Sequence, residues 1–195
     1  MQRRRVLAAL IAGAQLLCAC STFGPLPKAE RQYIGRFSVV TSLGGKRDNG
    51  SGRFKLAVEP ATVVLDLDSP LGSTLARIEV DPQGARLTAT GDSGIREVRG
   101  SSAEALTYEV LGWPLPVAGF RDWIDGRPVA ARPSTERTSN EGNGFEQDGW
   151  TITVLERFDE GRGAPRRLLF ERPEKPGTTP AINLRLVLDE PPTVR

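Results

Sequence analysis

The sequence predicts a mainly β protein with two helices, in which successive strands pair antiparallel. Six segments between residues 31 and 99 alternate apolar and polar side chains with a period of two, as strands with one buried face do. Short turns rich in glycine, proline and aspartate separate these segments, and such short links join antiparallel neighbours. The apolar spacing becomes helical between residues 101 and 126, and strand-like alternation resumes from residue 149.

The first nineteen residues have the pattern of an export signal. Three arginines at positions 3–5 precede an apolar run, residues 6–19, that is too short to span a bilayer comfortably. The run ends in the sequence LCAC, which resembles the bacterial lipobox, and Cys20 occupies the position that receives lipid. We therefore expect residues 1–19 to be a lipoprotein signal peptide. A disulfide between Cys18 and Cys20, or an ordinary signal peptide followed by an unpaired thiol, is the alternative.

The residues that follow Cys20 bear on where the protein resides. Ser21 stands where many enteric bacteria place the aspartate of inner-membrane retention, so the lipobox resemblance implies anchoring to the outer membrane, on its periplasmic face. Residues 20–30 contain two prolines and a glycine and are expected to form a lipidated tether. We expect residues 31–195 to fold as one domain, because about 175 residues can bury a substantial core.

The charge of the mature chain argues against a nucleic-acid partner. Removing the three arginines of the leader from the 26 basic residues leaves 23 against 24 acidic ones, a formal charge of −1. No arginine-rich tract interleaved with aromatic residues is found either.

The first half of the fold is predicted to be an antiparallel meander. The expected strands are residues 31–41, 52–58, 63–68, 75–80, 85–90 and 95–99. Residues 43–52 are rich in glycine, and we expect a turn or loop there.

Between the third and fourth expected strands lies a stiff loop with an apolar tip. Pro70 fixes its own φ and keeps Ser69 extended, while Gly72 permits backbone angles that other residues avoid. Leu71 is therefore predicted at the tip of a hairpin loop. It either projects into solvent or folds back over the sheet, and the spacing alone does not decide between these.

Two helices and a second group of strands complete the prediction. Ser101 and Glu104 have the spacing of a capping box before a helix that ends at Gly112, and a second helix is expected to start at Pro116, with Gly126 after its end. The polar residues 129–148 are predicted to be a long irregular connection or a weak hairpin. The last strands are expected at residues 149–158, 166–172 and 181–189.

The residue types available exclude several kinds of chemistry. The sequence contains no histidine, so Ser-His-Asp and Cys-His catalysis and histidine-containing metal sites are excluded. Asp66 and Asp68 could support carboxylate chemistry, but they share the strand face opposite Leu65 and Leu67, which is the pattern of a solvated face. Nucleotide-binding signatures are also absent. We expect a protein that is not an enzyme and has no cofactor and no metal site.

Several motifs in order identify a family. They are the lipobox, the loop sequence SPLGSTL at residues 69–75, the helix junction LGWPLP at residues 111–116, WIDG at residues 123–126, and the strands at residues 149–152 and 165–169. Together they cover nearly the whole mature chain, which resembles the LolB family of outer-membrane lipoprotein receptors within the LolA/LolB-like superfamily.

The resemblance implies a fold and a set of partners. It implies an antiparallel, incomplete β-barrel with helices covering an apolar cavity. It also implies a periplasmic carrier of the LolA type, acylated lipoprotein cargo and outer-membrane lipid as partners, and a loop of Pro70, Leu71 and Gly72 that inserts cargo into the membrane. We expect the chain to be a monomer. The expected cavity lining is Phe37, Phe54, Leu65, Leu67, Leu106, Val110, Phe120, Ile124, Trp150 and Ile152.

Two other functions remain open at this point. A lipid-anchored β-sheet scaffold or protein-interaction module of the cell envelope would have no deep apolar cavity and would not depend on Leu71. A lipid-anchored carboxylate hydrolase would bring at least two acidic groups together in a cleft with shifted pKa values.

Overall fold

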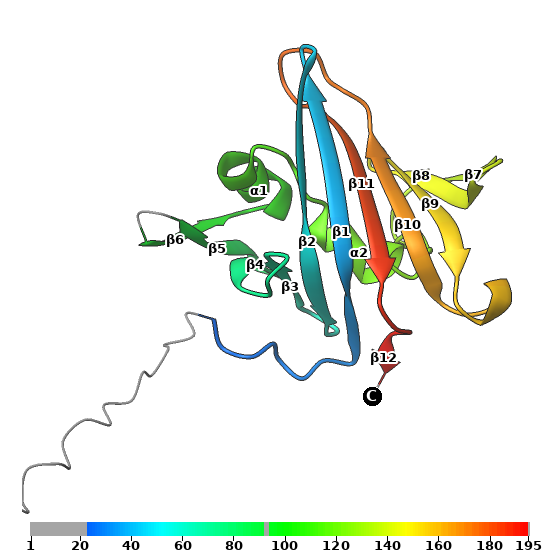
Figure 1. The fold of residues 1–195 in the computed structure, drawn as a ribbon, viewed down its shortest axis with the longest axis horizontal. Coiled ribbons are helices and arrows are strands. Elements are labelled where there is room, and N and C mark those ends of the chain that lie inside the picture. The colour runs from blue at the N-terminus through cyan, green and yellow to red at the C-terminus, as the bar shows by residue number, and fades with distance from the viewer. Residues whose placement is uncertain (1–22, 92–93, 195) are drawn as a thin grey trace, which may run out of the picture.

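The strands form one antiparallel sheet that curls around two helices without closing on itself (Figure 1). The computed structural model describes residues 23–91 and 94–194. The strand order is β6-β5-β4-β3-β2-β1-β11-β10-β9-β8-β7, and β12 pairs with β1. Since β6 and β7 are not paired with each other in the described chain, the sheet is an incomplete barrel, as predicted.

The bounds of the elements follow the predicted order. The strands are β1 (Arg31–Leu43), β2 (Lys46–Val58), β3 (Val63–Asp68), β4 (Thr74–Asp81), β5 (Gly84–Gly91), β6 (Gly94–Gly100), β7 (Thr135–Ser139), β8 (Gly142–Gln147), β9 (Trp150–Arg157), β10 (Pro165–Arg172), β11 (Ala181–Leu188) and β12 (Thr193–Val194). The helices are α1 (Ala103–Leu111), α2 (Val117–Trp123) and the short 3₁₀ turn η1 (Asp159–Gly161).

The first hairpin is longer than predicted. Residues 43–52 were expected to form a turn or loop, but β1 and β2 stay paired as far as Leu43 opposite Lys46. The turn is only Gly44 and Gly45, whose φ values of 57° and 80° suit the two central positions of a tight hairpin turn. The residues that suggested a turn, Asp48 to Gly50, lie in a part of β2 that is exposed on both faces and therefore carries no apolar alternation.

The helix boundaries agree with the prediction except at the first cap. Ser102, not Ser101, caps α1, because its Oγ accepts a hydrogen bond from the Ala105 N–H at 3.2 Å. Gly112 ends α1 with a φ of 81°, a conformation that favours glycine. The second helix begins after Pro116, as expected.

Residues 129–148 contain the hairpin that was one of the two predicted outcomes. Strands β7 and β8 pair over five positions, after an irregular stretch at residues 129–134. The buried Gln147 side chain holds that stretch, since its Oε1 accepts the Val129 N–H at 2.8 Å and its Nε2 donates to the Arg132 carbonyl at 3.0 Å. Its Oε1 also accepts the Trp123 indole N–H at 2.7 Å, which ties the hairpin to α2.

The core lies between the helices and the inner face of the sheet, which we define as the face that carries Leu65 and Leu67. In Figure 1 the strands β3–β6 and β7–β9 extend to either side of the long central strands; α1 lies over the arm of β4–β6, and α2 lies behind the central strands. Helix α1 contacts β4, β5 and β6, while α2 contacts β3 and β4. Among the described residues, no helix has the length and apolar character needed to cross a membrane.

Candidate functional site

A small apolar cavity lies where the helices meet the inner face of the sheet. Its lining is entirely apolar or aromatic and comes from four strands, helix α2 and the segment that joins the helices: Phe37, Phe54, Leu65, Leu67, Trp113, Leu115, Phe120, Leu184 and Leu186. The room left for a water-sized sphere is only about 10 Å³, because the side chains almost fill the space. In this arrangement the helices cover the cavity.

The predicted cavity residues divide into two groups. Phe37, Phe54, Leu65, Leu67 and Phe120 line the cavity. The other five do not line it but belong to the core around it: Leu106, Ile124, Trp150 and Ile152 are buried there, and Val110 packs against them.

Sequence reasoning did not select four of the lining residues. Trp113 and Leu115 lie in the segment between the helices, where the predicted helical period does not apply. Leu184 and Leu186 share the inner face of β11, and their alternation predicts burial without indicating which part of the core they face. The signal that could have found Trp113 and Leu115 is the concentration of aromatic residues in the helix junction.

The segment between the helices, residues 112–116, which we call the lid segment, is fastened to α1 by one buried side chain. The Thr107 Oγ donates to the Ala103 carbonyl at 2.8 Å and accepts the Leu115 N–H at 2.8 Å. Thr107 is fully buried, so its hydroxyl satisfies a backbone donor that water cannot reach. Loss of this contact would leave that donor unpaired and would free the lid segment.

The loop between β3 and β4 carries its leucine into solvent. Leu71 is 97% exposed, which decides between the two predicted positions in favour of the projecting one. The loop is closed by backbone hydrogen bonds from Ser69 N–H to the Ser73 carbonyl at 2.8 Å and from Gly72 N–H to the Ser69 carbonyl at 2.9 Å. Gly72 has a φ of 91°, where a side chain would be strained. The apolar tip is therefore held on an ordered loop.

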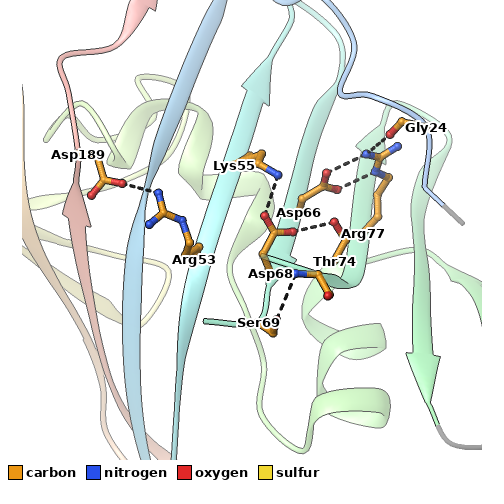
Figure 2. Close-up of polar contacts among 10 residues, drawn as sticks. Gly24, Arg53, Lys55, Asp66, Asp68, Ser69, Thr74, Arg77 and Asp189 are labelled. Carbon is orange, nitrogen blue, oxygen red and sulfur yellow. Dashed lines mark hydrogen bonds and ion pairs between the residues drawn. The ribbon is translucent and has the colours of Figure 1, made fainter. Parts of the chain in front are cut away.

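Polar contacts also fasten the base of this loop (Figure 2). The Asp68 carboxylate accepts the Thr74 hydroxyl proton at 2.7 Å, joining the last residue of β3 to the first of β4, and pairs with the Lys55 ammonium at 2.8 Å. The register shifts beside Asp68, so that Leu75 has no opposite residue on β3. Leu75 is 48% exposed and adds a second apolar side chain next to the loop.

The outer face of β3 is buried, contrary to the solvated face that its alternation suggested. Asp66 and Asp68 are only 3% and 2% exposed. Arg77 on β4 donates to both Asp66 carboxylate oxygens, at 2.7 and 2.8 Å, and this hydrogen bonding raises the pKa of the Arg77 guanidinium above its usual value. Because each carboxylate has its own cation and faces away from the cavity, the two do not form the acidic cleft expected of a hydrolase.

A second polar cluster joins β1 to the end of α2. Asp125, from the WIDG motif, accepts a hydrogen bond from the Tyr33 hydroxyl at 2.8 Å and from Arg31 at 2.5 Å, and pairs with Arg127 at 2.9 Å. Burial, together with the charge of Asp125, raises the pKa of Tyr33 above its usual range. The cluster fixes the end of α2 to β1.

A second, larger groove has a different character and lies elsewhere. It is open, measures about 680 Å³, and is lined by β8, β9, β10 and η1, including Glu156, Arg157 and Arg166. It shares no residue with the apolar cavity or with the loop. Across residues 23–91 and 94–194, no three His, Cys, Asp or Glu side chains are placed to hold a metal ion.

The predicted lipidation site precedes the part of the chain that the structure describes. Cys20 and the predicted signal peptide, residues 1–19, lie outside the described residues. The described part of the expected tether begins at Phe23 and runs along the outer face of the sheet towards β1.

Comparison with known proteins agrees with the motifs. The profile of the family described as "Outer membrane lipoprotein LolB" matches residues 30–190. A protein named outer-membrane lipoprotein LolB from Cupriavidus pinatubonensis is 37% identical over 207 residues, which cover 97% of this chain and 96% of the relative. One of the same name from Bordetella pertussis is 39% identical over 163 residues, covering 81% and 77%.

Among solved structures, a LolA superfamily protein from Nitrosomonas europaea superposes with a TM-score of 0.45 and 11% identity, over 85% of this chain and 87% of that one. The family match spans most of the chain, and the identities extend over nearly its full length. The resemblance drawn from the sequence motifs is thereby confirmed, and the chain belongs to the LolB family of outer membrane lipoproteins.

Proposed function

We propose that this protein accepts acylated lipoproteins from a periplasmic carrier of the LolA type and inserts them into the outer membrane. The observation that carries the proposal is the combination of an entirely apolar cavity under the helices with a fully exposed leucine on an ordered loop. A carrier for acyl chains needs an apolar cavity, and a protein that transfers its cargo into lipid uses an exposed apolar side chain on an ordered loop.

The space that an acyl chain needs can be compared with the cavity. Burying a methylene is worth about 0.8 kcal/mol, so an acyl chain of ~15 methylenes loses roughly 12 kcal/mol of favourable transfer when it is left in water. If each methylene takes about the 30 Å³ of one liquid water molecule, such a chain needs roughly 450 Å³. The cavity holds about 10 Å³, so loading has to displace lining side chains. Trp113 and Leu115, on the lid segment, are the lining residues outside regular structure.

The Leu71 loop suits contact with a bilayer. An apolar side chain held in advance on a closed loop enters lipid with little loss of conformational freedom. Leu75 stands beside it and enlarges the apolar surface. We assign Pro70, Leu71 and Gly72 to membrane insertion of the cargo, with Gly72 supplying the backbone angle and Pro70 the stiffness.

The remaining assignments follow from the family and the motifs. Residues 1–19 serve as the signal peptide, Cys20 carries the lipid on the periplasmic side of the outer membrane, and residues 31–195 form the receptor domain, which works as a monomer. No hydrolysable cofactor is needed, because the cargo moves from a weaker site on the carrier to a tighter one and finally to the bilayer. The protein acts as a receptor and not as an enzyme.

The test is a transfer assay with a soluble form that lacks Cys20. This form is incubated with carrier loaded with a fluorescent lipoprotein, and the two proteins are separated before the label is counted. We expect the label to move to the soluble form and then to added vesicles. If the label stays on the carrier, the receptor function is wrong and a lipid-anchored scaffold becomes the better description. Carrier incubated with a protein lacking an apolar cavity serves as the control.

A further inference from the structure

The described part of the tether, residues 23–30, is bound to the outer face of the sheet and does not extend freely from β1. Leu26 and Ala29 pack against Ala57 on β2 and Val64 on β3 in a small apolar cluster separate from the main core. The Gln32 side-chain amide donates to the Pro27 carbonyl at 3.1 Å. These contacts direct the tether across the strands that lead to the Leu71 loop.

The start of this segment is held by Arg77 (Figure 2). One guanidinium nitrogen donates to the Gly24 carbonyl at 2.8 Å, and the guanidinium carbon lies 5.7 Å from the centre of the Phe23 ring. The same guanidinium forms the paired hydrogen bonds to Asp66. Arg77 is therefore fixed by the sheet. Its Nη2, which donates to Asp66, also donates to the tether, and the face of the guanidinium lies against the Phe23 ring. We call Arg77, Ala57 and Val64 the tether dock.

The tether dock lies close to the loop along the strands. Asp66 stands opposite Arg77, and the next outward-facing residue of β3 is Asp68, which holds the base of the loop. At about 3.3 Å per residue, Asp66 and Ser69 are separated by roughly 10 Å along the strand. The tether is thus held on the part of the sheet that ends in Leu71.

Docking also shortens the spacer that precedes the fold. A fully extended chain spans at most about 3.6 Å per residue, so an undocked tether from residue 20 to residue 30 could separate the lipid from the domain by up to about 36 Å. With Phe23 held at the tether dock, only two residues lie between it and Cys20, and the three residue steps from Cys20 to Phe23 span at most about 11 Å. A shorter spacer raises the effective concentration of the loop at the membrane that holds the anchor.

We propose that the tether dock orients the receptor, so that the lipid on Cys20 and the Leu71 loop meet the same membrane surface at close range. This inference rests on the proposed function. It adds that residues 23–30 act as a positioning element, and that docking matters for delivery by the anchored protein and not for acceptance from the carrier.

The test compares tether variants in anchored and soluble forms. Phe23→Ser with Leu26→Ser removes the two larger apolar side chains with which the tether contacts the sheet, without changing any residue of the sheet. Lys28→Ser with Glu30→Ser changes two exposed residues of the same segment, keeps the net charge and serves as the matched control. Each variant is prepared in the lipidated form in phosphatidylethanolamine and phosphatidylglycerol vesicles, and in the form lacking Cys20. Fluorescent lipoprotein supplied on the carrier reports acceptance and delivery.

We expect the undocked variant to accept cargo normally and, when anchored, to deliver it about tenfold more slowly, the scale on which spacer geometry changes effective concentration. Without Cys20 its delivery rate should equal that of the unchanged soluble form, and the control pair should match the unchanged protein in both forms. An anchored undocked variant that delivers at the normal rate would overturn the inference. Equal slowing in both forms would overturn it too, because the tether would then act on the fold.

A second measurement reports orientation directly. Ser73 is exposed on the loop, and the mature chain carries no cysteine besides Cys20, so Ser73→Cys accepts a single bimane label. Spin-labelled lipid should quench this label strongly in the anchored protein and weakly after undocking; equal quenching would contradict the proposal. A parallel Leu71→Glu sample separates the proposed function from the role of the tether dock. Normal delivery by Leu71→Glu contradicts the proposed function. If Leu71→Glu fails to deliver while the undocked variant delivers at the normal rate, only the role of the tether dock is contradicted.

Discussion

Asp68 and Thr74 join the two arms of the Leu71 loop through a hydrogen bond of 2.7 Å between the Thr74 hydroxyl and the Asp68 carboxylate. The carboxylate is almost completely buried and its other oxygen pairs with Lys55, so the bond is protected from water. This contact and the backbone hydrogen bonds of the loop, rather than packing of the leucine itself, hold the exposed tip.

Replacing Thr74 with valine should loosen the loop and lower the stability of the fold. The substitution keeps the side-chain shape but removes the donor to a buried charge, which costs about 1.5–3 kcal/mol in the free energy of unfolding. Urea unfolding measures the loss, and a spin label at position 73 should become more mobile. Thr74→Ser keeps the hydroxyl and should stay near the unchanged protein; an equal loss in both variants would contradict the role of the hydrogen bond.

Leu71→Glu should separate acceptance of cargo from its delivery. The tip contacts nothing in the fold, so stability and loading from the carrier should not change. A charged side chain costs roughly 3 kcal/mol more than an apolar one to place inside the bilayer, so delivery to vesicles should fall by about a hundredfold. Leu71→Met should deliver nearly normally. Ile95→Glu places the same charge on another exposed apolar position, and slowing of similar size there would point to general repulsion from the membrane.

Thr107→Val should release the lid segment. The valine fills the same volume but leaves the buried Leu115 N–H without an acceptor, which costs about 1–3 kcal/mol. We expect the Leu115 amide to exchange with solvent about tenfold faster or more, and acceptance of cargo to become faster because opening costs less. Thr107→Ser keeps the hydroxyl and serves as the control. Unchanged exchange at Leu115 in the valine variant would show that another contact holds the lid segment.

Tyr33 should make the fold sensitive to alkali. Burial and Asp125 raise its pKa in the folded state, while in the unfolded chain it titrates near pH 10. The unfolded state therefore loses a proton above about pH 10 that the folded state keeps, so stability is complete below this pH and falls above it by up to about 1.4 kcal/mol per pH unit. Denaturant midpoints from pH 8 to 11 measure this slope. Tyr33→Phe should show a shallower slope, and an identical one would assign the sensitivity to other groups.

Strand alternation and turn chemistry were sufficient to predict most of the fold. The segments that became β3, β4 and β5 alternate because one face packs on the helices, and Gly112 and Pro116 mark the ends of the helices through their backbone preferences. The prediction failed at Asp48 to Gly50, where β2 extends beyond the core and backbone pairing alone keeps the strand. Apolar and polar residues alternate with a period of two where one face of a strand is buried, and this pattern does not arise where both faces are exposed.

The candidate site was predictable in part. Pro70 and Gly72 identify a stiff loop, but only the structure shows that Leu71 projects. The pairing of Asp66 with Arg77 depends on the register between β3 and β4. The burial of this ion pair depends on the tether, which Arg77 holds in place through the Gly24 carbonyl. These contacts join separate segments, so no local pattern contains them. The same holds for Trp113 and Leu115, whose position depends on how the helices pack.

The gap between β6 and β7 has a mechanical consequence. Backbone hydrogen bonds run across the described sheet from one edge to the other but do not bridge this gap. The two arms of the sheet can therefore move apart by bending about the central strands β1 and β11. Spreading costs side-chain contacts and no ladder bonds, which keeps the deformation reversible and elastic. A closed barrel of the same strands would have to break interstrand hydrogen bonds to admit a bulky acyl chain. This open barrel can instead widen and return to its original shape after the cargo leaves.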